Sequence, residues 1–231
     1  MQRYFVSSLT HEITGPDAHH ITKVMRMKSG DEVVVCGLGR CFLVELKIED
    51  HKVFYTEKEE YKKDLEPKVT LIQGLPKHPK GETVSKYATL FGASEIKFVP
   101  MIRSIAKPDN EANKLKRLEL IIKEAAELSH RFDVPSVSFE TSLKTIDWKK
   151  FSTVLVAYEN EKTLTLPIAL PNVSYDDHIA IVIGPEGGIS DQEIHYFESL
   201  QAKMVSLGKR ILPTELAALY ALTYISLQNA E

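Results

Sequence analysis

The stretch Ile179-Ala-Ile-Val-Ile-Gly-Pro-Glu-Gly-Gly-Ile-Ser190 carries the strongest fold signal in this chain. Five apolar residues, mostly β-branched, lead directly into a loop of three glycines and a proline at residues 184–188. Such a run predicts a strand buried on both faces, as in a parallel sheet, and glycines let a loop backbone approach a ligand. Ser190 and Glu193 then match a helix capping box. Strand, glycine loop and capped helix are typical of a ligand site in an open α/β sheet, although a simple tight turn is the alternative.

The predicted elements change in kind near residue 68. Before it, three short β-rich runs at 32–36, 40–48 and 53–56 predict a small barrel or meander, and the charged residues 57–68 predict a linker. From Val69 onward, predicted strands alternate with predicted helices, which is the pattern of a parallel sheet. We therefore expect two domains, a β-barrel over 1–68 and an α/β domain over 69–231.

Charge is distributed unevenly along the chain, although the formal net charge is only −3. Residues 69–131 hold 11 Lys and Arg against 7 Asp and Glu, whereas residues 132–231 hold 7 against 13. Nucleic-acid binding requires a local basic face rather than a positive total. The basic middle therefore permits an RNA partner; a surface that is unevenly charged without any such role is the alternative.

Several classes of protein are disfavoured by what the sequence lacks. No apolar run approaches the roughly 20 residues of a membrane helix, and the first residues lack the pattern of a signal peptide. The two cysteines, Cys36 and Cys41, cannot make a disulfide framework, and their spacing predicts no zinc site. We expect a cytoplasmic protein with no membrane partner and no metal.

Three loops that follow predicted strands are candidates for one binding pocket: residues 158–160, 184–188 and 207–214. Loops after parallel strands emerge at the same edge of a sheet. Their main-chain groups and apolar side chains suit a flat heteroaromatic ring, whereas neither a triphosphate nor a dinucleotide motif is present. The last predicted helix, from Thr214 to about Gln228, is apolar around most of its circumference, so we expect it to be buried in the core or between subunits.

Two of these segments carry a resemblance to a known family. Gly184-Pro-Glu-Gly-Gly-Ile-Ser190 and Leu207-Gly-Lys-Arg-Ile-Leu-Pro-Thr-Glu215 resemble the two C-terminal motifs of the SPOUT methyltransferases and, more narrowly, of the ribosomal RNA small subunit methyltransferase E family. Further matching stretches follow in the family's order and extend over essentially the whole chain: Arg3-Tyr4-Phe5, residues 20–26, Gly30-Asp31, Arg103-Ser104, and residues 124–131 with Pro135.

The resemblance implies both a fold and an activity. It implies an N-terminal PUA-like RNA-binding β-barrel and a C-terminal SPOUT-type α/β domain with a trefoil knot. The cofactor would be S-adenosyl-L-methionine, bound in the knot at a homodimer interface. The reaction would be methylation of N3 of a uridine in 16S rRNA, with the small ribosomal subunit or its RNA as the partner.

Candidate residues follow from the pocket and the resemblance together. Because uridine N3 carries a proton, a general base must remove it or cations must stabilise the deprotonated ring. Glu186 and Glu215 are candidate bases, and Arg103, Arg131 and Arg210 are candidate stabilisers or phosphate contacts, while a structural salt bridge or a helix-end role is the alternative for each. Candidate cofactor-binding residues are Tyr158, Glu159, Ile183, Gly184, Pro185, Gly187, Leu207, Gly208, Ile211, Leu212 and Thr214. Candidate RNA-binding residues are Arg3, Arg26, Lys77, Lys80 and Arg131.

The chain departs from the family pattern at a few positions. Pro213 and Leu216 stand where the family usually has arginine and threonine, so a cation near the pocket is lost. Leu128 replaces a usual glutamine, and Tyr87 and Leu90 replace lysine and glutamate. These departures leave two alternatives open, a methyltransferase that acts on another RNA site and an RNA-binding homologue with weakened catalysis.

Overall fold

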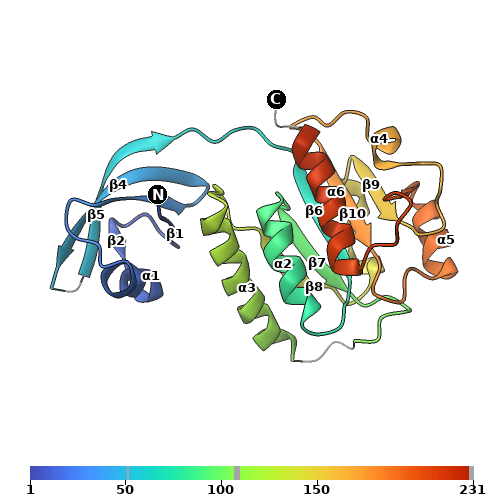
Figure 1. Ribbon diagram of the computed structural model, residues 1–231, viewed down its shortest axis with the longest axis horizontal. Coiled ribbons are helices and arrows are strands. Elements are labelled where there is room, and N and C mark those ends of the chain that lie inside the picture. Colours follow the sequence, from blue (N-terminus) through green and yellow to red (C-terminus); the bar gives the residue numbers. More distant parts are fainter. Residues whose placement is uncertain (51, 107–109, 229–231) are drawn as a thin grey trace. The chain divides into compact units, whose positions relative to one another are not determined.

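The computed structural model describes residues 1–50, 52–106 and 110–228, which form two compact units (Figure 1). The first unit comprises Met1–Asp64 and Ala126–Val134, and the second comprises the rest of the chain. Residues 126–134 thus pack with the N-terminal unit although they lie far beyond the expected boundary at residue 68.

The first unit is built on a five-stranded sheet of order β1-β3-β4-β5-β2. β1 pairs with β3 in parallel, and the other neighbours are antiparallel. Alternating side chains of β4 are buried, as expected for a sheet with one face on a core. A short helix, α1, continues into a π-helical turn. The bounds are β1 Arg3–Phe5, β2 Glu12–Ile13, α1 Gly15–His19, the π-helical turn His20–Val24, β3 Glu32–Gly37, β4 Arg40–Glu49 and β5 Lys52–Tyr61.

The prediction of a linker that begins at residue 57 is wrong for its first residues, because β5 continues to Tyr61. The charges that suggested a linker are neutralised across the sheet. Lys58 Nζ lies 2.6 Å from Glu45 Oε2 and 2.9 Å from Glu32 Oε1, and Arg40 Nε lies 2.7 Å from Glu60 Oε1. Opposite charges on neighbouring strands stabilise a solvated sheet face, so a charged run can form a strand.

Two kinds of contact tie residues 126–134 to the strands of the first unit. Arg3 Nη1 donates hydrogen bonds to the carbonyl oxygens of His130 at 2.6 Å and Arg131 at 2.5 Å. Cys36 and Cys41 lie opposite each other on β3 and β4 and form a disulfide, which the sequence reasoning did not anticipate. Phe132 packs against this disulfide.

The second unit holds a six-stranded sheet of order β11-β9-β10-β6-β7-β8, in which all pairings of neighbouring strands are parallel. β10 and β6 occupy the middle and are almost entirely buried. The predicted double-faced burial of residues 179–183 is therefore confirmed. The bounds are β6 Lys68–Gly74, β7 Glu95–Val99, β8 Ser136–Phe139, β9 Thr153–Ala157, β10 His178–Ile183 and β11 Lys203–Val205.

The helices of the second unit follow these strands. The predicted capping box begins α5, because Ser190 Oγ accepts from Glu193 N at 3.3 Å while Ser190 N donates to Glu193 Oε2 at 2.9 Å. α6 packs beside α2 and against β10 (Figure 1). The bounds are α2 Lys80–Leu90, α3 Glu111–Leu128, 3₁₀ turns Leu143–Thr145 and Trp148–Lys150, α4 Leu166–Ala169, α5 Asp191–Ser199 and α6 Thr214–Gln228.

The last helix, α6, is buried on one side only. Ala217, Ala221 and Ile225 belong to its buried side. Tyr220, by contrast, is 53% exposed, and Leu216 and Leu227 are also exposed. Among the helices of the described residues, none is both long and apolar enough to span a bilayer.

Candidate active site

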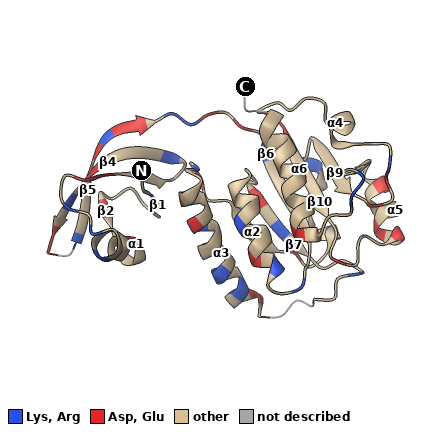
Figure 2. Cartoon of the chain, viewed as in Figure 1, with Lys and Arg blue, Asp and Glu red and all other residues tan. Residues whose placement is uncertain are grey.

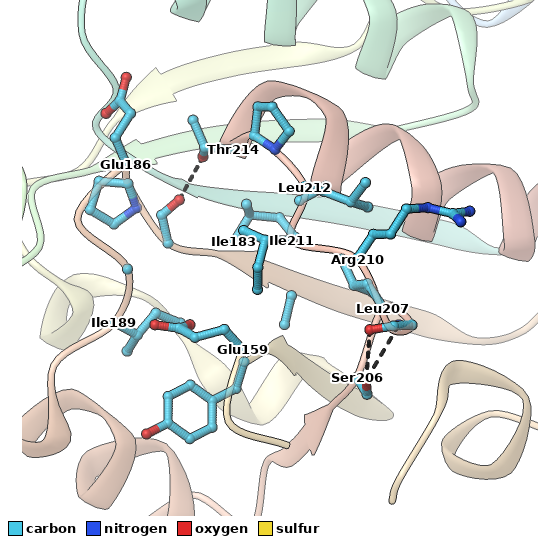
Figure 3. Close-up of a pocket in the computed structure, with 18 of the residues that line it drawn as sticks. Glu159, Ile183, Glu186, Ile189, Ser206, Leu207, Arg210, Ile211, Leu212 and Thr214 are labelled. Carbon is cyan, nitrogen blue, oxygen red and sulfur yellow. Dashed lines mark hydrogen bonds between the residues drawn. The ribbon is translucent and has the colours of Figure 1, made fainter. Parts of the chain in front are cut away.

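A cavity of about 490 Å³ opens at the carboxyl edge of the second unit's sheet (Figure 3). The segments that follow β9, β10 and β11 line it, as does the start of α6. The prediction that three loops meet at one edge of a parallel sheet is therefore confirmed. The lining residues are Lys80, Ala157, Tyr158, Glu159, Lys162, residues 183–189, residues 206–214 and Ala217.

Glycines of the loop after β10 are required for packing as well as for an open cavity. A Cβ atom on Gly184 would lie 2.8 Å from Ile189 Cγ1. A Cβ atom on Gly187 would lie 2.8 Å from the carbonyl oxygen of Arg103. Both distances are shorter than real Cβ contacts, so neighbouring protein atoms exclude any side chain at these two positions. These two glycines therefore make room for neighbouring protein atoms as well as for a ligand.

Every residue that the sequence suggested for cofactor binding lines this cavity: Tyr158, Glu159, Ile183, Gly184, Pro185, Gly187, Leu207, Gly208, Ile211, Leu212 and Thr214. Five other lining residues were not predicted from the sequence: Ala157, Lys162, Ile189, Ser206 and Ala217. Each lies within a few residues of a chosen position, so a wider window around each loop would have found them.

Two hydrogen bonds hold the walls of the cavity in place (Figure 3). The Thr214 hydroxyl donates to the carbonyl oxygen of Gly184 at 2.6 Å, which ties the start of α6 to the glycine loop. The backbone N–H of Gly208 donates to Ser206 Oγ at 3.3 Å. The loops that form the cavity are therefore bonded to one another or within themselves.

Lys80, expected to contact RNA, lies at this cavity and pairs with both candidate bases. Its Nζ is 2.9 Å from Glu215 Oε2 and 3.6 Å from Glu186 Oε1. The hydrogen bond to Glu215 raises the pKa of Lys80. Burial raises the pKa of Glu215, but the hydrogen bonds from Lys80 and from its own backbone N–H outweigh burial and leave that pKa below its usual value. Glu215 is therefore held as an ionised partner of Lys80, which weakens it as a base.

The other candidate catalytic residues differ in their access to the cavity. Glu186 and Arg210 line it. Glu186 Oε1 also accepts a hydrogen bond from the backbone N–H of Lys77 at 3.1 Å. Arg103 lies behind the glycine loop, where its Nη1 donates to the carbonyl oxygen of Gly187 at 3.4 Å. Of the four candidate catalytic residues, Glu186 and Arg210 thus belong to the cavity wall, whereas Arg103 and Glu215 do not.

The expected RNA-binding residues are placed in different ways. Arg26 and Lys77 are exposed. Arg3 is engaged with backbone carbonyls of residues 130 and 131, and its burial lowers its pKa. Arg131 Nε donates to the carbonyl oxygen of Asp133 at 3.3 Å. Basic residues also gather along the first half of α3 (Figure 2), where they are Lys114, Lys116 and Arg117.

Comparisons with known proteins identify the family. A model of the RNA methyltransferase domain matches residues 63–226, and a model of the RNA methyltransferase PUA domain matches residues 13–53. The chain is 34% identical to ribosomal RNA small subunit methyltransferase E of Bacillus subtilis, over 99% of this chain and 97% of that protein.

Solved structures share the fold of this chain. A crystal structure described as a hypothetical protein superposes with a TM-score of 0.89 at 33% identity, covering 99% of both chains. Ribosomal RNA small subunit methyltransferase E from Neisseria gonorrhoeae, bound to S-adenosyl methionine, shares the fold with a TM-score of 0.82 at 24% identity, over 98% of this chain and 97% of that one. The resemblance inferred from the sequence is confirmed: the chain belongs to the ribosomal RNA small subunit methyltransferase E family of RNA methyltransferases.

Proposed function

We propose that the protein methylates N3 of a specific uridine in 16S rRNA of the small ribosomal subunit, with S-adenosyl-L-methionine as methyl donor. The observation that carries this proposal is the cavity at the carboxyl edge of the sheet, built by three loops in a chain of this family. The Neisseria gonorrhoeae relative, whose fold the chain shares, is bound to the same cofactor.

The residues around the cavity fit this cofactor. Ile183, Leu207 and Leu212 offer apolar surface for an adenine ring, and the glycine loop offers main-chain groups for its edge. Glu159 adds a carboxylate that can accept hydrogen bonds from hydroxyl or ammonium groups. The cofactor supplies an electrophilic methyl group on a positively charged sulfur. The chain itself must bind and orient the two reactants, which is worth several kcal/mol of a reaction barrier.

The chain's own residues must also manage the N3 proton. We assign proton acceptance to Glu186, because it lines the cavity and Glu215 does not. Lys80 lies between the two carboxylates and holds Glu215 ionised, so Glu215 acts on the site through Lys80. Arg210 is placed to stabilise negative charge that develops on the uracil ring. Arg103 supports the glycine loop from behind.

The remaining expectations are part of the same proposal. The first unit would act as the PUA-like RNA-binding domain, with Arg26 available to phosphates, and Lys77 of the second unit would be available to phosphates as well. The exposed apolar residues Leu216, Tyr220 and Leu227 of α6 suit a homodimer interface. We also propose the trefoil knot and a cytoplasmic location, where ribosomal subunits assemble.

The decisive experiment compares rRNA nucleosides by mass spectrometry in cells with and without the gene. We expect N3-methyluridine to disappear from 16S rRNA in the deletion strain and to return with the intact gene. Unchanged N3-methyluridine, or loss of a different modified nucleoside, contradicts the uridine-N3 assignment.

One observation favours a second candidate function, an RNA-binding protein without turnover. Pro213 lines the cavity and brings no charge to it. Isothermal titration calorimetry with S-adenosyl-L-methionine separates the two functions, because the enzyme must bind its cofactor. Absence of heat at millimolar cofactor, from protein that is folded and dimeric, would support the second function.

A further inference from the structure

Gln73 is a fully buried polar residue that lies next to the cavity but does not line it. It sits near the end of β6, opposite Ile183 of β10, and none of its surface is exposed. Its Nε2 donates to Thr214 Oγ1 at 2.8 Å and to the carbonyl oxygen of Gly74 at 3.1 Å, with a longer contact of 3.4 Å to the carbonyl oxygen of Gly184. One side-chain amide therefore joins the end of β6 to two other segments of the chain, at Gly184 and Thr214.

The direction of these hydrogen bonds is determined by the surrounding acceptors. Gly74 and Gly184 present carbonyl oxygens, and the Thr214 hydroxyl donates its single hydrogen to Gly184 at 2.6 Å. All three neighbours need a donor, so Nε2 rather than Oε1 must face them. Gln73 Oε1 has no hydrogen-bond partner among the described residues. The amide thus acts here purely as a donor.

The backbone around Gln73 leaves little freedom for the glycine loop. A Cβ atom on Gly74 would lie 2.5 Å from Pro185 Cδ, so the end of β6 is in close contact with the loop that lines the cavity. Thr214, which Gln73 contacts, is the first residue of α6 and also lines the cavity. A change at Gln73 can therefore reach two walls of the cavity without removing any lining atom.

We propose that Gln73 is a positioning residue for the cofactor cavity. Its amide orients the Thr214 hydroxyl, which in turn fixes the Gly184 carbonyl, so that the glycine loop and the start of α6 keep the spacing that the cofactor requires. The inference rests on the proposed function, because it assumes the cofactor named there. The inference also has a purely structural part: one buried amide holds the glycine loop and the start of α6 in place. This part applies to the unliganded protein as well.

The test replaces Gln73 by methionine, which has a similar length and no donor. Thr70→Val is the matched control: Thr70 lies on the same strand, is also fully buried, and its hydroxyl bonds to Glu95 and His178, away from the cavity. Hydrogen–deuterium exchange of the unliganded proteins reports on residues 184–190 and 206–217. Titration calorimetry with S-adenosyl-L-methionine reports on affinity, and methyl transfer at saturating cofactor reports on kcat.

We expect Gln73→Met to increase exchange in those two segments and to weaken cofactor binding about tenfold, with a much smaller change in kcat. Thr70→Val should lower thermal stability while affinity and exchange in the two segments stay at wild-type values. Unchanged exchange in Gln73→Met, or equal effects of both substitutions on affinity, would overturn the inference. If the wild type binds no cofactor, the proposed function fails, and the exchange comparison still decides the role of Gln73.

A second pair of variants guards against loss of folding in Gln73→Met. Thr214→Ser keeps the hydroxyl that links Gln73 to Gly184, and Thr214→Val removes it. We expect wild-type exchange in the serine variant and increased exchange at residues 184–190 in the valine variant. The double variant Gln73→Met with Thr214→Val should be no worse than either single variant, since both break one network. Additive effects would contradict the proposal.

Discussion

The two edges of the second unit's sheet both carry charged side chains, but they use them differently. At the amino edge, Lys150 Nζ lies 2.7 Å from Glu95 Oε2. Glu95 Oε1 lies 3.2 Å from Nζ of Lys97, and the same Nζ lies 2.6 Å from Oε1 of Glu140, just beyond the end of β8. Cations and carboxylates there neutralise one another. At the carboxyl edge, Arg210 lines a cavity and forms no ion pair with the described residues. Lys80 at the carboxyl edge is also paired, with Glu215 and Glu186, so the two edges differ in Arg210, a cation of the cavity wall that is left available for chemistry.

The largest expected effect separates the two edges directly. Arg210→Gln removes the cation that faces the cavity and should lower kcat/KM for methyl transfer by about 10²-fold or more. Lys150→Gln removes a cation from the amino edge and should leave activity within about twofold, because exposed ion pairs contribute little. Methyl transfer from labelled cofactor to small ribosomal subunits measures both. Similar losses in the two variants would contradict the assignment of chemistry to the carboxyl edge.

A second comparison lies within the carboxyl edge itself. Glu186→Gln should lower kcat by about 10²-fold, the usual contribution of a general base. Glu215→Gln should lower kcat less, because Glu215 does not line the cavity and acts through Lys80. The pH dependence of kcat distinguishes the two variants. The decrease of kcat at acidic pH should be absent in Glu186→Gln and present in Glu215→Gln. Reversed behaviour would make Glu215 the base.

Substitution of the glycine loop tests the packing at the same edge. Gly187→Ala places a methyl group 2.8 Å from the Arg103 carbonyl oxygen, so we expect a loss of about 1–3 kcal/mol in the free energy of unfolding and weaker cofactor binding. Gly81→Ala in α2 is the control, because a methyl group there meets only Phe98 at 3.8 Å. Urea denaturation should show little change or a slight gain for Gly81→Ala, since alanine favours helix. A tolerated Gly187→Ala would refute the tight packing.

The smallest effect is expected from the pH dependence of stability through Glu95, Glu140 and His178. Burial raises the pKa values of Glu95 and Glu140, but the hydrogen bonds and charge of Lys97, and of Lys150 at Glu95, leave both below their ordinary value of 4.5. Burial, with the nearby charge of Lys150, lowers the pKa of His178 below 6.5. As pH falls, the unfolded chain takes up these protons before the folded chain does, so stability decreases.

This loss should begin near pH 6.5 for His178 and continue below pH 4.5 for the two carboxylates. The His178 contribution should be small, because the group is only partly buried. Urea unfolding between pH 8 and pH 5 measures it, and His178→Gln should flatten the curve in that range. A curve that keeps its slope in His178→Gln would assign the effect to other groups.

Local patterns predicted the carboxyl edge well, since its geometry is encoded over short stretches. The apolar run, the glycines and the Ser190–Glu193 capping pair act within one segment of chain, and parallel pairing then brings three loops together. The place of Lys80 was missed because its partners, Glu186 and Glu215, are more than 100 residues away in sequence. Gln73 was missed for the same reason: a lone polar residue at the end of an apolar run shows no periodic pattern.

The features of the first unit that could not be predicted from the sequence have a related physical cause. The sequence at the end of β5 is, by itself, typical of solvated coil. It forms a strand in the structure, where Lys58 pairs with Glu45 and Glu32 across the sheet. The contact of Arg3 with residues 130 and 131 joins positions more than 120 residues apart, and no local signal marks it. Contacts of this kind depend on the finished topology, so they could be read only from the structure.

The membership of residues 126–134 in the first unit has a consequence for how this gene can be divided. The chain passes from one unit to the other three times, after Asp64, after Ala125 and after Val134. A fragment that ends at residue 64 would therefore lack the carbonyl acceptors of Arg3 and the ring of Phe132 that packs on the Cys36–Cys41 disulfide. A single recombination point cannot exchange the N-terminal unit intact between relatives. An exchange of the intact first unit must carry residues 126–134 along with residues 1–64.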